Sequence, residues 1–456
     1  MSADSLMIRA LKASARLRLA DPVARLLSRR IRSEQEPADA DYRVLYLDKL
    51  GLAEDLASSL GNDGRFALLA LDRAALKAVA RAFLPEDVTD NSYTLERPGF
   101  AEAKAAYRAF LCAVFRRLVA WHRIDAVMSA NFAYVAEREL HAAAEQIGLP
   151  FIVMQKENLK TAGNAPFFQT LYQELRGPFQ GRRLLVYNDI ERELEIASGV
   201  ARPEQLTLTG MPRLDRLHVW RQQAGDDRRS DRPTVLFFYF SDKTGLPFDP
   251  QFGPSIYADH GGPFDPALRA LTWDELKRQT LSAMVGLARD NPDLNVVVKG
   301  KVDHIKGGQM AEAIATQGGA PANLRLIGGG DPFELIQQAD AVCGFISTAL
   351  LEALAAGKPV IQPCFAEATD ESYSDYLLDL GEASANATDP EHLIALLATT
   401  ARRRAPVTAD LHPAAAVALQ RWTGNNDGKA GQRVAAAVAE EIEANRATQP
   451  LAHGAR

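Results

Sequence analysis

Cysteine is scarce in this chain of 456 residues, which contains only Cys112, Cys343 and Cys364. Their spacing matches neither a metal-binding motif nor a disulfide framework. Two of the three lie in apolar, strand-like segments, and cysteines in such positions are usually buried free thiols. Free thiols are typical of a reducing cytoplasm, which is the compartment that we predict.

Long apolar runs and a basic excess are also missing. No run approaches the roughly 20 residues that a helix needs to cross a bilayer, and no uninterrupted apolar stretch near the N-terminus resembles a signal peptide. The net charge of −6 differs from the basic excess that is usual in nucleic-acid-binding proteins. We therefore predict a protein without membrane spans that binds no nucleic acid.

One segment departs from the acidic average. Residues 6–32 interleave leucine, isoleucine and valine with arginine and lysine, so this segment is basic within an acidic chain. A basic amphipathic segment can lie on an anionic membrane surface, which would place the protein at the inner face of the cell membrane. It can equally be a surface helix that packs on the protein with its arginines in water. The sequence leaves both interpretations open.

Short apolar segments alternate with helical ones from residue 42 onward. The chain is longer than one ordinary core requires, so we expect two domains. Alternating strands and helices predict parallel sheets with helices on both faces. The predicted strands are 42–48, 65–72, 124–130, 149–155, 181–189, 204–210, 234–240, 294–300, 323–328, 340–345 and 358–363, and one of the predicted helices is 133–148.

A polar, charged stretch at 221–233 interrupts this alternation, which then starts again. We interpret the stretch as a linker, and we predict an α/β fold with two tandem Rossmann-like, doubly wound domains and an interdomain cleft. The predicted divisions are 1–40 (basic N-terminal segment), 41–220 (N-terminal domain), 221–233 (linker), 234–410 (second domain) and 411–456 (C-terminal helices).

The segment from 341 to 363 carries polar residues where ligands of such domains bind, beyond the carboxyl end of a strand. Gly344, Ser347 and Thr348 follow the strand, and the helix after them is apolar except for Glu352. Thr348 and Glu352 are four residues apart, so they share one face of the helix.

The N-terminus of a helix that follows a strand can bind a phosphate group. A carboxylate one turn further, about 5.4 Å along the axis, would repel that phosphate but would accept hydrogen bonds from the hydroxyls of a ribose. The pattern therefore predicts a nucleotide site that contains Gly344, Ser347, Thr348 and Glu352. The alternative is that Ser347 only caps the helix and Glu352 pairs with Lys358.

Lysines follow two other strands of the second domain. Lys299 and Lys301 come at the end of 294–300, and Lys243 follows 234–240. Lysines in these positions can neutralise a departing nucleotide phosphate without a metal ion. The alternative is an exposed basic turn, but the position of Lys299 and Lys301 at the carboxyl end of a strand favours the phosphate role. Because the sequence contains neither a metal-binding motif nor a phosphate-binding loop of the G-x-x-x-x-G-K-[ST] type, we predict no metal and no other cofactor.

Two segments resemble known enzymes. The 341–363 segment, with Ser347, Thr348, Glu352 and the exit "EALAAGKPVI", resembles the donor-nucleotide signature of GT-B-fold glycosyltransferases. The sequence "LTLTGMPRLDRL" at 206–217 is similar to a segment of bacterial surface-carbohydrate enzymes, among them CDP-glycerol glycerophosphotransferases and UDP-N-acetylglucosamine 2-epimerases. The residues "FIST" stand where the epimerases usually carry a glycine pair, which counts against an epimerase.

The resemblance implies that the second domain binds the nucleotide-sugar donor and the N-terminal domain binds the acceptor. An inverting sugar transfer needs a general base that takes a proton from the acceptor hydroxyl. Our first candidate is Glu157, which follows the strand at 149–155. Its alternative role is an ion pair with Lys156 or Lys160.

The second candidates for the base are Asp259 and His260. They lie in a stretch at 241–266 that is rich in glycine, proline and aromatic residues and is too long for a simple turn. Loops of this length are often functional, and we interpret this one as a lid or ligand loop.

We therefore predict a metal-independent glycosyltransferase that moves a sugar from a UDP- or CMP-linked donor to a surface-glycan or lipid-linked acceptor. Two alternatives on the same fold remain open, a sugar-nucleotide epimerase and a glycerophosphate-type transferase. A third alternative is a non-enzymatic protein whose two domains close on a small ligand, but such a protein would not need Glu352 in an apolar helix.

Overall fold

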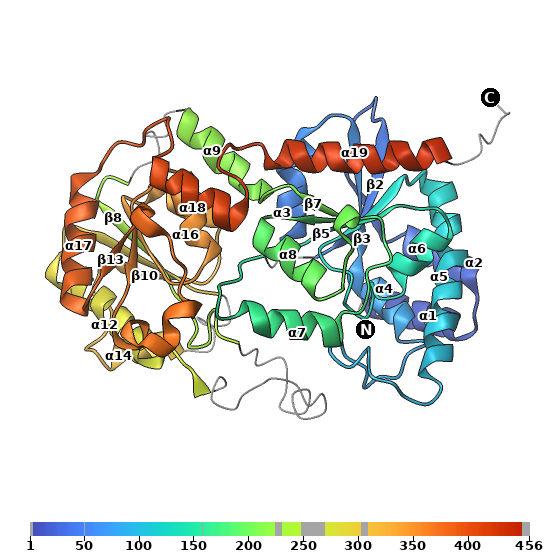
Figure 1. Cartoon of the computed structure of the whole chain (residues 1–456), viewed down its shortest axis with the longest axis horizontal. Coiled ribbons are helices and arrows are strands. Elements are labelled where there is room, and N and C mark those ends of the chain that lie inside the picture. The colour runs from blue at the N-terminus through green and yellow to red at the C-terminus, as the bar shows by residue number, and fades with distance from the viewer. Residues whose placement is uncertain are drawn as a thin grey trace.

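Two α/β domains lie side by side in the computed structural model of the chain (Figure 1). The structure describes residues 3–49, 51–156, 158–223, 230–247, 270–301 and 309–448. Each domain is built around one sheet, of seven strands in the N-terminal domain and six strands in the second domain.

The sheet of the N-terminal domain contains β1 (Ile31–Gln35), β2 (Tyr42–Asp48), β3 (Phe66–Asp72), β4 (Ala126–Ser129), β5 (Phe151–Met154), β6 (Arg183–Val186) and β7 (Leu206–Leu208). Their order is β1-β3-β2-β4-β5-β6-β7. β1 pairs antiparallel with β3, and all other neighbours are parallel. The carboxyl ends of six strands therefore meet at one edge of this sheet.

Helices cover both faces of this sheet. Alternate residues of each strand point to opposite sides, and because apolar residues point to both sides, each face needs a layer of helices. Leu45 and Leu47 of β2 belong to one core cluster, and Val44 and Tyr46 belong to another. The helices up to the linker are α1 (Ala3–Arg16), α2 (Ala20–Ser28), α3 (Leu52–Ala57), α4 (Arg73–Ala80), α5 (Phe100–His122), α6 (Leu140–Gln146), α7 (Ala165–Leu175), α8 (Asp189–Ala197) and α9 (Asp215–Gln222), with short 3₁₀ turns η1 (Leu60–Asn62), η2 (Pro203–Gln205) and η3 (Pro212–Leu214).

The second domain has a wholly parallel sheet in the order β10-β9-β8-β11-β12-β13. Its strands are β8 (Thr234–Phe238), β9 (Asn295–Lys299), β10 (Leu324–Ile327), β11 (Ala341–Cys343), β12 (Val360–Pro363) and β13 (Ser384–Ala387). Its helices are α12 (Asp274–Asp290), α14 (Gln309–Ala315), α15 (Pro332–Gln338), α16 (Thr348–Ala355), α17 (Pro390–Arg403) and α18 (Pro413–Thr423), with 3₁₀ turns η4 (Ala366–Thr369), η5 (Glu371–Tyr376) and η6 (Gly381–Ala383). Two such sheets confirm the predicted fold class, two tandem Rossmann-like domains.

The last helix, α19 (Ala430–Thr448), returns to the N-terminal domain (Figure 1). Val434 and Val438 of α19 are fully buried in the same cluster as Val44 of β2. Asp215 caps the start of α19, because its carboxylate accepts hydrogen bonds from the Ala430 amide at 3.1 Å and the Gly431 amide at 2.7 Å. The return of α19 thus ties the end of the chain to the segment before the linker.

The structure differs from the sequence prediction at two places in the N-terminal part of the chain. Residues 31–35, which the prediction placed in the basic segment before the domain, form the edge strand β1. The predicted helix at 133–148 begins only at Leu140. Upstream of it, Glu137 binds Arg73 at 2.5 Å and Glu139 binds Arg108 at 2.7 Å, and both carboxylates are buried. These ion pairs hold the segment out of helical geometry.

Membrane-spanning helices are absent from the part of the chain that the structure describes, since no helix there combines the necessary length with the necessary apolar character.

Candidate functional site

The start of α16 is shaped by a cap and by a strained residue. Ser347 is the N-cap, and its hydroxyl oxygen accepts a hydrogen bond from the Ala349 amide at 3.2 Å. Ile346, just before it, has a φ of +41°, a conformation that β-branched residues rarely adopt. Ile346 packs against Gly245, where an added Cβ would lie 2.7 Å from its side chain. Such strain is concentrated at functional sites in proteins, which makes this turn a candidate binding element.

Glu352 is the one charged residue of α16, and it is buried, with 6% of its surface exposed. Burial raises the pKa of its carboxyl group to about 7, although the positive charges of Arg213 and Arg216 oppose this shift. Among the residues that the structure describes, none donates a hydrogen bond to this carboxylate. Glu352 is therefore a buried acceptor that a ligand could satisfy.

Arg213, from the N-terminal domain, stands across the domain junction from Glu352. Its Nε lies 3.1 Å from Asp55 Oδ1, and its Nη2 lies 3.4 Å from the hydroxyl of Tyr187. The Tyr187 hydroxyl in turn donates to Asp55 Oδ2 at 3.3 Å. Burial raises the pKa of the Asp55 carboxyl group, and Arg213 acts against that shift. These three side chains form a buried, mutually paired cluster at the carboxyl edge of the N-terminal sheet.

Two lysines add positive charge to this cluster. Burial and the charge of Arg213 lower the pKa of Lys156, whereas Asp55 acts to raise it. Gly51 lies against this lysine, since a Cβ there would meet the Lys156 ammonium. Lys49 lies nearby after β2, with its ammonium 4.2 Å from the centre of the Tyr134 ring. Cations from two strand ends thus converge beside Arg213.

Hydrogen bonds between the domains fix the junction around these residues. Arg216 makes two bonds of 2.9 Å to the carboxylate of Asp331, the N-cap of α15. The Gly163 amide donates to the Asp375 carbonyl at 2.8 Å, and the Asn164 side chain donates to the Gly245 carbonyl at 3.1 Å. The carboxyl edges of the two sheets therefore face each other across a defined interface.

The predicted residues of the second domain fall into two groups. Gly344, Ser347, Thr348 and Glu352 lie together at the turn from β11 into α16. Lys358, the alternative partner of Glu352, donates instead to the Gln337 carbonyl at 2.9 Å.

The predicted lysines lie at other strand ends of the same sheet. Lys243 Nζ donates to the Leu271 carbonyl at 2.5 Å, and Lys299 Nζ donates to the Gly300 carbonyl at 3.1 Å. Lys301 is exposed. Contact of these three lysines with a phosphate stays a prediction.

Three predicted catalytic residues, Glu157, Asp259 and His260, lie outside the residues that the structure describes. Lys160 was predicted as an alternative ion-pair partner of Glu157. Its Nζ lies 3.5 Å from Glu191 Oε2 in the protein interior. Within the described ranges, no three or more His, Cys, Asp or Glu side chains are grouped so that they could hold a metal ion. Metal independence stays a prediction.

The sequence analysis did not assign Arg213, Asp55 or Tyr187 to the site. For Arg213 a signal was present, because it belongs to the "TGMPRLD" segment, which served only as evidence of family resemblance. Asp55 follows β2 inside a short helix and has no motif around it. In the structure, two residues of "TGMPRLD" have different roles. Arg213 lies at the domain junction, and Asp215 caps α19.

This arrangement combines donors and acceptors that suit one kind of ligand. A carboxylate on a buried helix can accept hydrogen bonds from a pair of hydroxyl groups, and the positive end of the same helix can attract an anion. Arginine and lysine across the junction can neutralise a second anionic group. The site therefore fits a molecule that has vicinal hydroxyls one helical turn from a phosphate.

Comparison with known proteins gives structural similarity alone. No family model and no curated protein matches the sequence. The chain is similar to a UDP-N-acetylglucosamine 2-epimerase from Neisseria meningitidis bound to UDP-GlcNAc, at 11% identity, a TM-score of 0.46, and coverage of 88% of this chain and 100% of that chain.

Two further solved structures show similarity of the same extent. One is Anabaena HepE in complex with UDP and glucose, at 17% identity, a TM-score of 0.44, and coverage of 87% of this chain and 99% of that chain. The other is a glycosyltransferase from Rickettsia africae, at 10% identity, a TM-score of 0.47, and coverage of 88% and 99%. These are the kinds of protein that the sequence resemblance named. The fold assignment itself stands on the two sheets and their strand order.

Proposed function

We propose that the protein is a glycosyltransferase that uses a nucleotide-sugar donor. The proposal depends on the environment of Glu352. Its carboxylate is buried one helical turn inside α16, its pKa is raised, and it lies across the junction from Arg213. A buried carboxylate without a hydrogen-bond donor is unfavourable unless a partner supplies one. The vicinal hydroxyls of a ribose supply two.

The phosphates of the donor belong at the start of α16 in this proposal. Ser347 and Thr348 stand there, and the positive end of the helix dipole favours an anion. Arg213 and Lys156 approach from the other domain and would stabilise the charge that develops on the departing nucleotide. The donor is UDP- or CMP-linked, and the acceptor is a surface glycan or a lipid-linked glycan. No metal is assigned to the reaction.

The base that activates the acceptor is Glu157 in our proposal, with Asp259 and His260 as second candidates. Glu157 follows Lys156, whose ammonium lies at the junction near Asp55. A carboxylate in this role takes the proton of the acceptor hydroxyl as the new glycosidic bond forms.

The test is a calorimetric titration with UDP, CMP and ADP for the wild type, Glu352→Gln and the control Glu391→Gln. Glu391 is exposed on α17 of the same domain, so its substitution should leave binding unchanged. Loss of two charge-assisted hydrogen bonds should weaken UDP or CMP binding by about 100-fold in Glu352→Gln. If the wild type binds no nucleotide, or if both variants bind as the wild type does, the proposal is wrong.

A second candidate is a sugar-nucleotide epimerase, and one observation favours it. Moving a proton at a sugar carbon requires an acid or base within the site, and Asp55 is a buried carboxyl group of raised pKa beside Lys156 and Arg213. Proton NMR of UDP-sugars incubated with the protein and no acceptor separates the candidates. Solvent deuterium incorporated into the sugar ring supports the epimerase, and an unchanged donor supports the transferase.

A further inference from the structure

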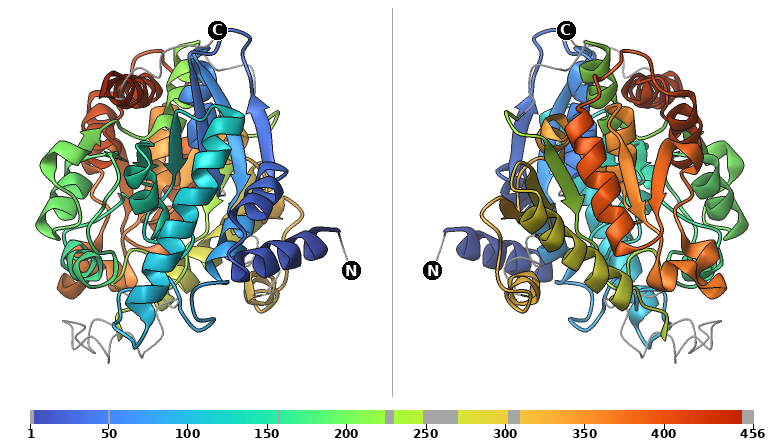
Figure 2. Two further views of the ribbon diagram at one scale, coloured as in Figure 1. Left: turned by 90° about the vertical axis from the view of Figure 1, so that its right-hand side faces the viewer. Right: turned by 90° about the vertical axis from the view of Figure 1, so that its left-hand side faces the viewer.

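The first two helices pack on the N-terminal domain through one side only. Leu11, Val23 and Leu27 are fully buried in the core cluster of that domain. On another side of the same helix pair, Leu6 is 56% exposed and Leu17 is 70% exposed. Figure 2 shows that the N-terminal end of α1 projects beyond the body of the molecule. The buried residues fit a helix that packs on the protein, and the exposed leucines fit a helix that lies on a membrane surface.

The exposed side of α1 is a continuous stripe. Leu6, Ala10, Ala13 and Leu17 follow one another at spacings of four, three and four residues, and all four are exposed. Residues at such spacings share one helix face. Leu19, 45% exposed, extends the apolar surface into the turn before α2. Single exposed leucines are ordinary, but a contiguous apolar surface marks a contact site.

Basic residues border this stripe. Arg9, Arg16 and Arg18 are exposed, and the Arg18 guanidinium carbon lies 3.6 Å from the centre of the Phe83 ring. Residues 1–32 contain eight arginine or lysine residues and two aspartates, although the whole chain has a net charge of −6. Three of these basic residues pair with carboxylates: Lys12 with Glu86, Arg30 with Asp72, and Arg32 with Asp48. The charge beside the stripe that can attract an anionic partner therefore comes from the exposed arginines of α1 and of the turn after it.

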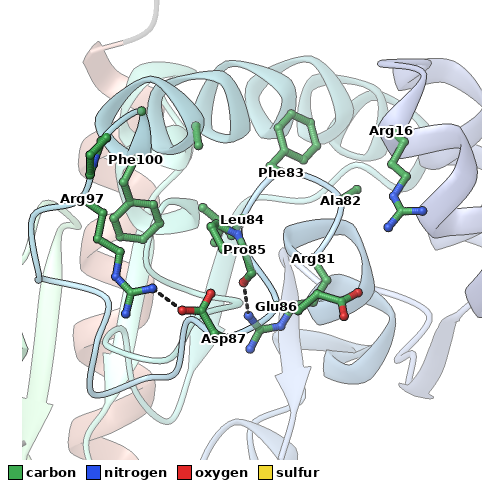
Figure 3. A pocket seen from close by; sticks show the side chains of 13 residues that line it. Arg16, Arg81, Ala82, Phe83, Leu84, Pro85, Glu86, Asp87, Arg97 and Phe100 are labelled. Atoms are coloured by element: carbon green, nitrogen blue, oxygen red, sulfur yellow. Dashed lines mark hydrogen bonds and ion pairs between the residues drawn. The ribbon is translucent and has the colours of Figure 1, made fainter.

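A cavity of about 620 Å³ opens next to the stripe (Figure 3). Its lining includes three arginines, two aromatic rings and two carboxylates: Arg16, Arg81, Arg97, Phe83, Phe100, Glu86 and Asp87. Arg81 donates to the Pro85 carbonyl at 2.9 Å, and Arg97 pairs with Asp87 at 2.5 Å. Arg16, which lines the cavity, is exposed and directly precedes Leu17 of the stripe, so the cavity begins at the end of α1 where the stripe ends. Its size is that of sites for small organic molecules, and its arginines suit a phosphate group.

We propose that this surface docks on a bilayer that contains anionic phospholipids. Leu6 and Leu17 insert at the level of the headgroups, and the arginines beside them contact lipid phosphates, one of which enters the cavity lined by Arg16. Apolar insertion and electrostatic attraction together are what an interfacial helix needs to bind a membrane surface. This docking is independent of the proposed transferase activity, because the surface lies outside the domain junction.

Vesicle co-sedimentation of the full chain tests the proposal. The wild type should bind vesicles of phosphatidylcholine mixed with phosphatidylglycerol, and it should lose that binding at high salt. It should not bind vesicles of phosphatidylcholine alone. Leu17→Glu should reduce the partition coefficient about tenfold, and Arg16→Ala should reduce it about fivefold. The control is Val417→Glu on α18, because Val417 is 71% exposed, as Leu17 is, but lies in the other domain.

Several results would overturn the proposal. Equal binding to both kinds of vesicle would show that lipid charge has no role. Equal losses of vesicle binding in Leu17→Glu and Val417→Glu would show that α1 is not the docking surface. Stabilisation by inorganic phosphate without vesicle binding would assign the cavity to a soluble anion. Circular dichroism of each variant shows that a loss of binding does not come from unfolding.

Discussion

The two sides of the domain junction are built in opposite ways. On the N-terminal side the charged groups are paired with one another, as Asp55 is with Arg213 and Tyr187. On the second side a single carboxylate, Glu352, is buried in an otherwise apolar helix, and the described residues donate no hydrogen bond to it. Asp55 has charged and hydroxyl partners on its own side, although its Oδ1 and the Arg213 Nε make no hydrogen bond, whereas Glu352 has no hydrogen-bond donor among the described residues.

This difference separates structure from binding. A buried ion pair whose members satisfy each other resists the loss of either partner. A buried carboxylate without donors lowers the stability of the folded state and gains stability when a ligand supplies them. We therefore expect the loss of Arg213 to damage folding first, and the loss of Glu352 to damage binding while the protein stays folded. The following predictions test this division, from the largest expected effect to the smallest.

Arg213→Ala should destabilise the protein by about 3–5 kcal/mol, because it leaves the Asp55 carboxylate buried without its main partner. Urea denaturation measures the loss. The control Arg402→Ala breaks an exposed ion pair with Asp293 and should cost at most about 1 kcal/mol. Adding Asp55→Asn to Arg213→Ala should restore part of the stability, and equal losses in Arg213→Ala and Arg402→Ala would break the comparison.

Glu352→Gln should stabilise the protein above neutral pH, whereas Arg213→Ala destabilises it. The pKa of Glu352 rises from 4.5 to about 7 on folding, so the folded state binds the proton more tightly and loses stability as the pH rises from about 4.5 to 7. Glutamine does not ionise and avoids this loss. The stability of the variant relative to the wild type should therefore grow by about 2–3 kcal/mol between pH 5 and pH 8. A constant difference across this range would contradict the burial of an unpaired carboxylate.

Nucleotide binding should depend on pH through the same group. Ribose hydroxyls donate to the ionised carboxylate, so affinity should fall by about tenfold for each pH unit below about 7. The measurement is the dissociation constant of UDP or CMP between pH 5.5 and 8, as a pH series of about six titrations. In Glu352→Gln only the dependence that comes from the second ionisation of the nucleotide phosphate, about pH 6, should remain. A slope as steep as that of the wild type in this variant would assign the titration to another residue.

Ser347→Ala should give the smallest effect, a loss of about 1 kcal/mol of stability from the removal of the N-cap of α16. Asp389→Ala is the matched control, because Asp389 caps α17 by accepting from the His392 amide at 2.7 Å. Both variants should lose similar stability in thermal melts. Only Ser347→Ala should also weaken nucleotide binding, and a similar effect of both on binding would reduce Ser347 to a cap.

Local patterns were enough to predict most of the architecture. The strand predicted at 42–48 has the bounds of β2, and the long helix α5 lies in a segment of unbroken helical periodicity. The start of α16 was also predictable, since a serine before an apolar helical run is a common N-cap. These features depend on residues that are neighbours in the sequence.

The elements that the sequence analysis missed depend on partners far along the chain. β1 has the sequence "IRSEQ" and β13 has "SANA", and neither shows the apolar pattern of a strand. Both lie at the edge of a sheet, where pairing with one neighbour is enough and burial is low. Segment 133–139 has a helical pattern, but it forms buried ion pairs with distant residues in place of a helix.

The sequence by itself determined two parallel α/β domains and a helix with one buried carboxylate, because strand and helix periodicity and caps are local properties. Only the tertiary structure decided that Glu352 faces Arg213, and that Arg213 is held by Asp55 and Tyr187. These four residues come from widely separated positions in two domains, and burial brings their charges within reach of one another. No local pattern can carry that information, because the strength of each interaction depends on the water that folding removes.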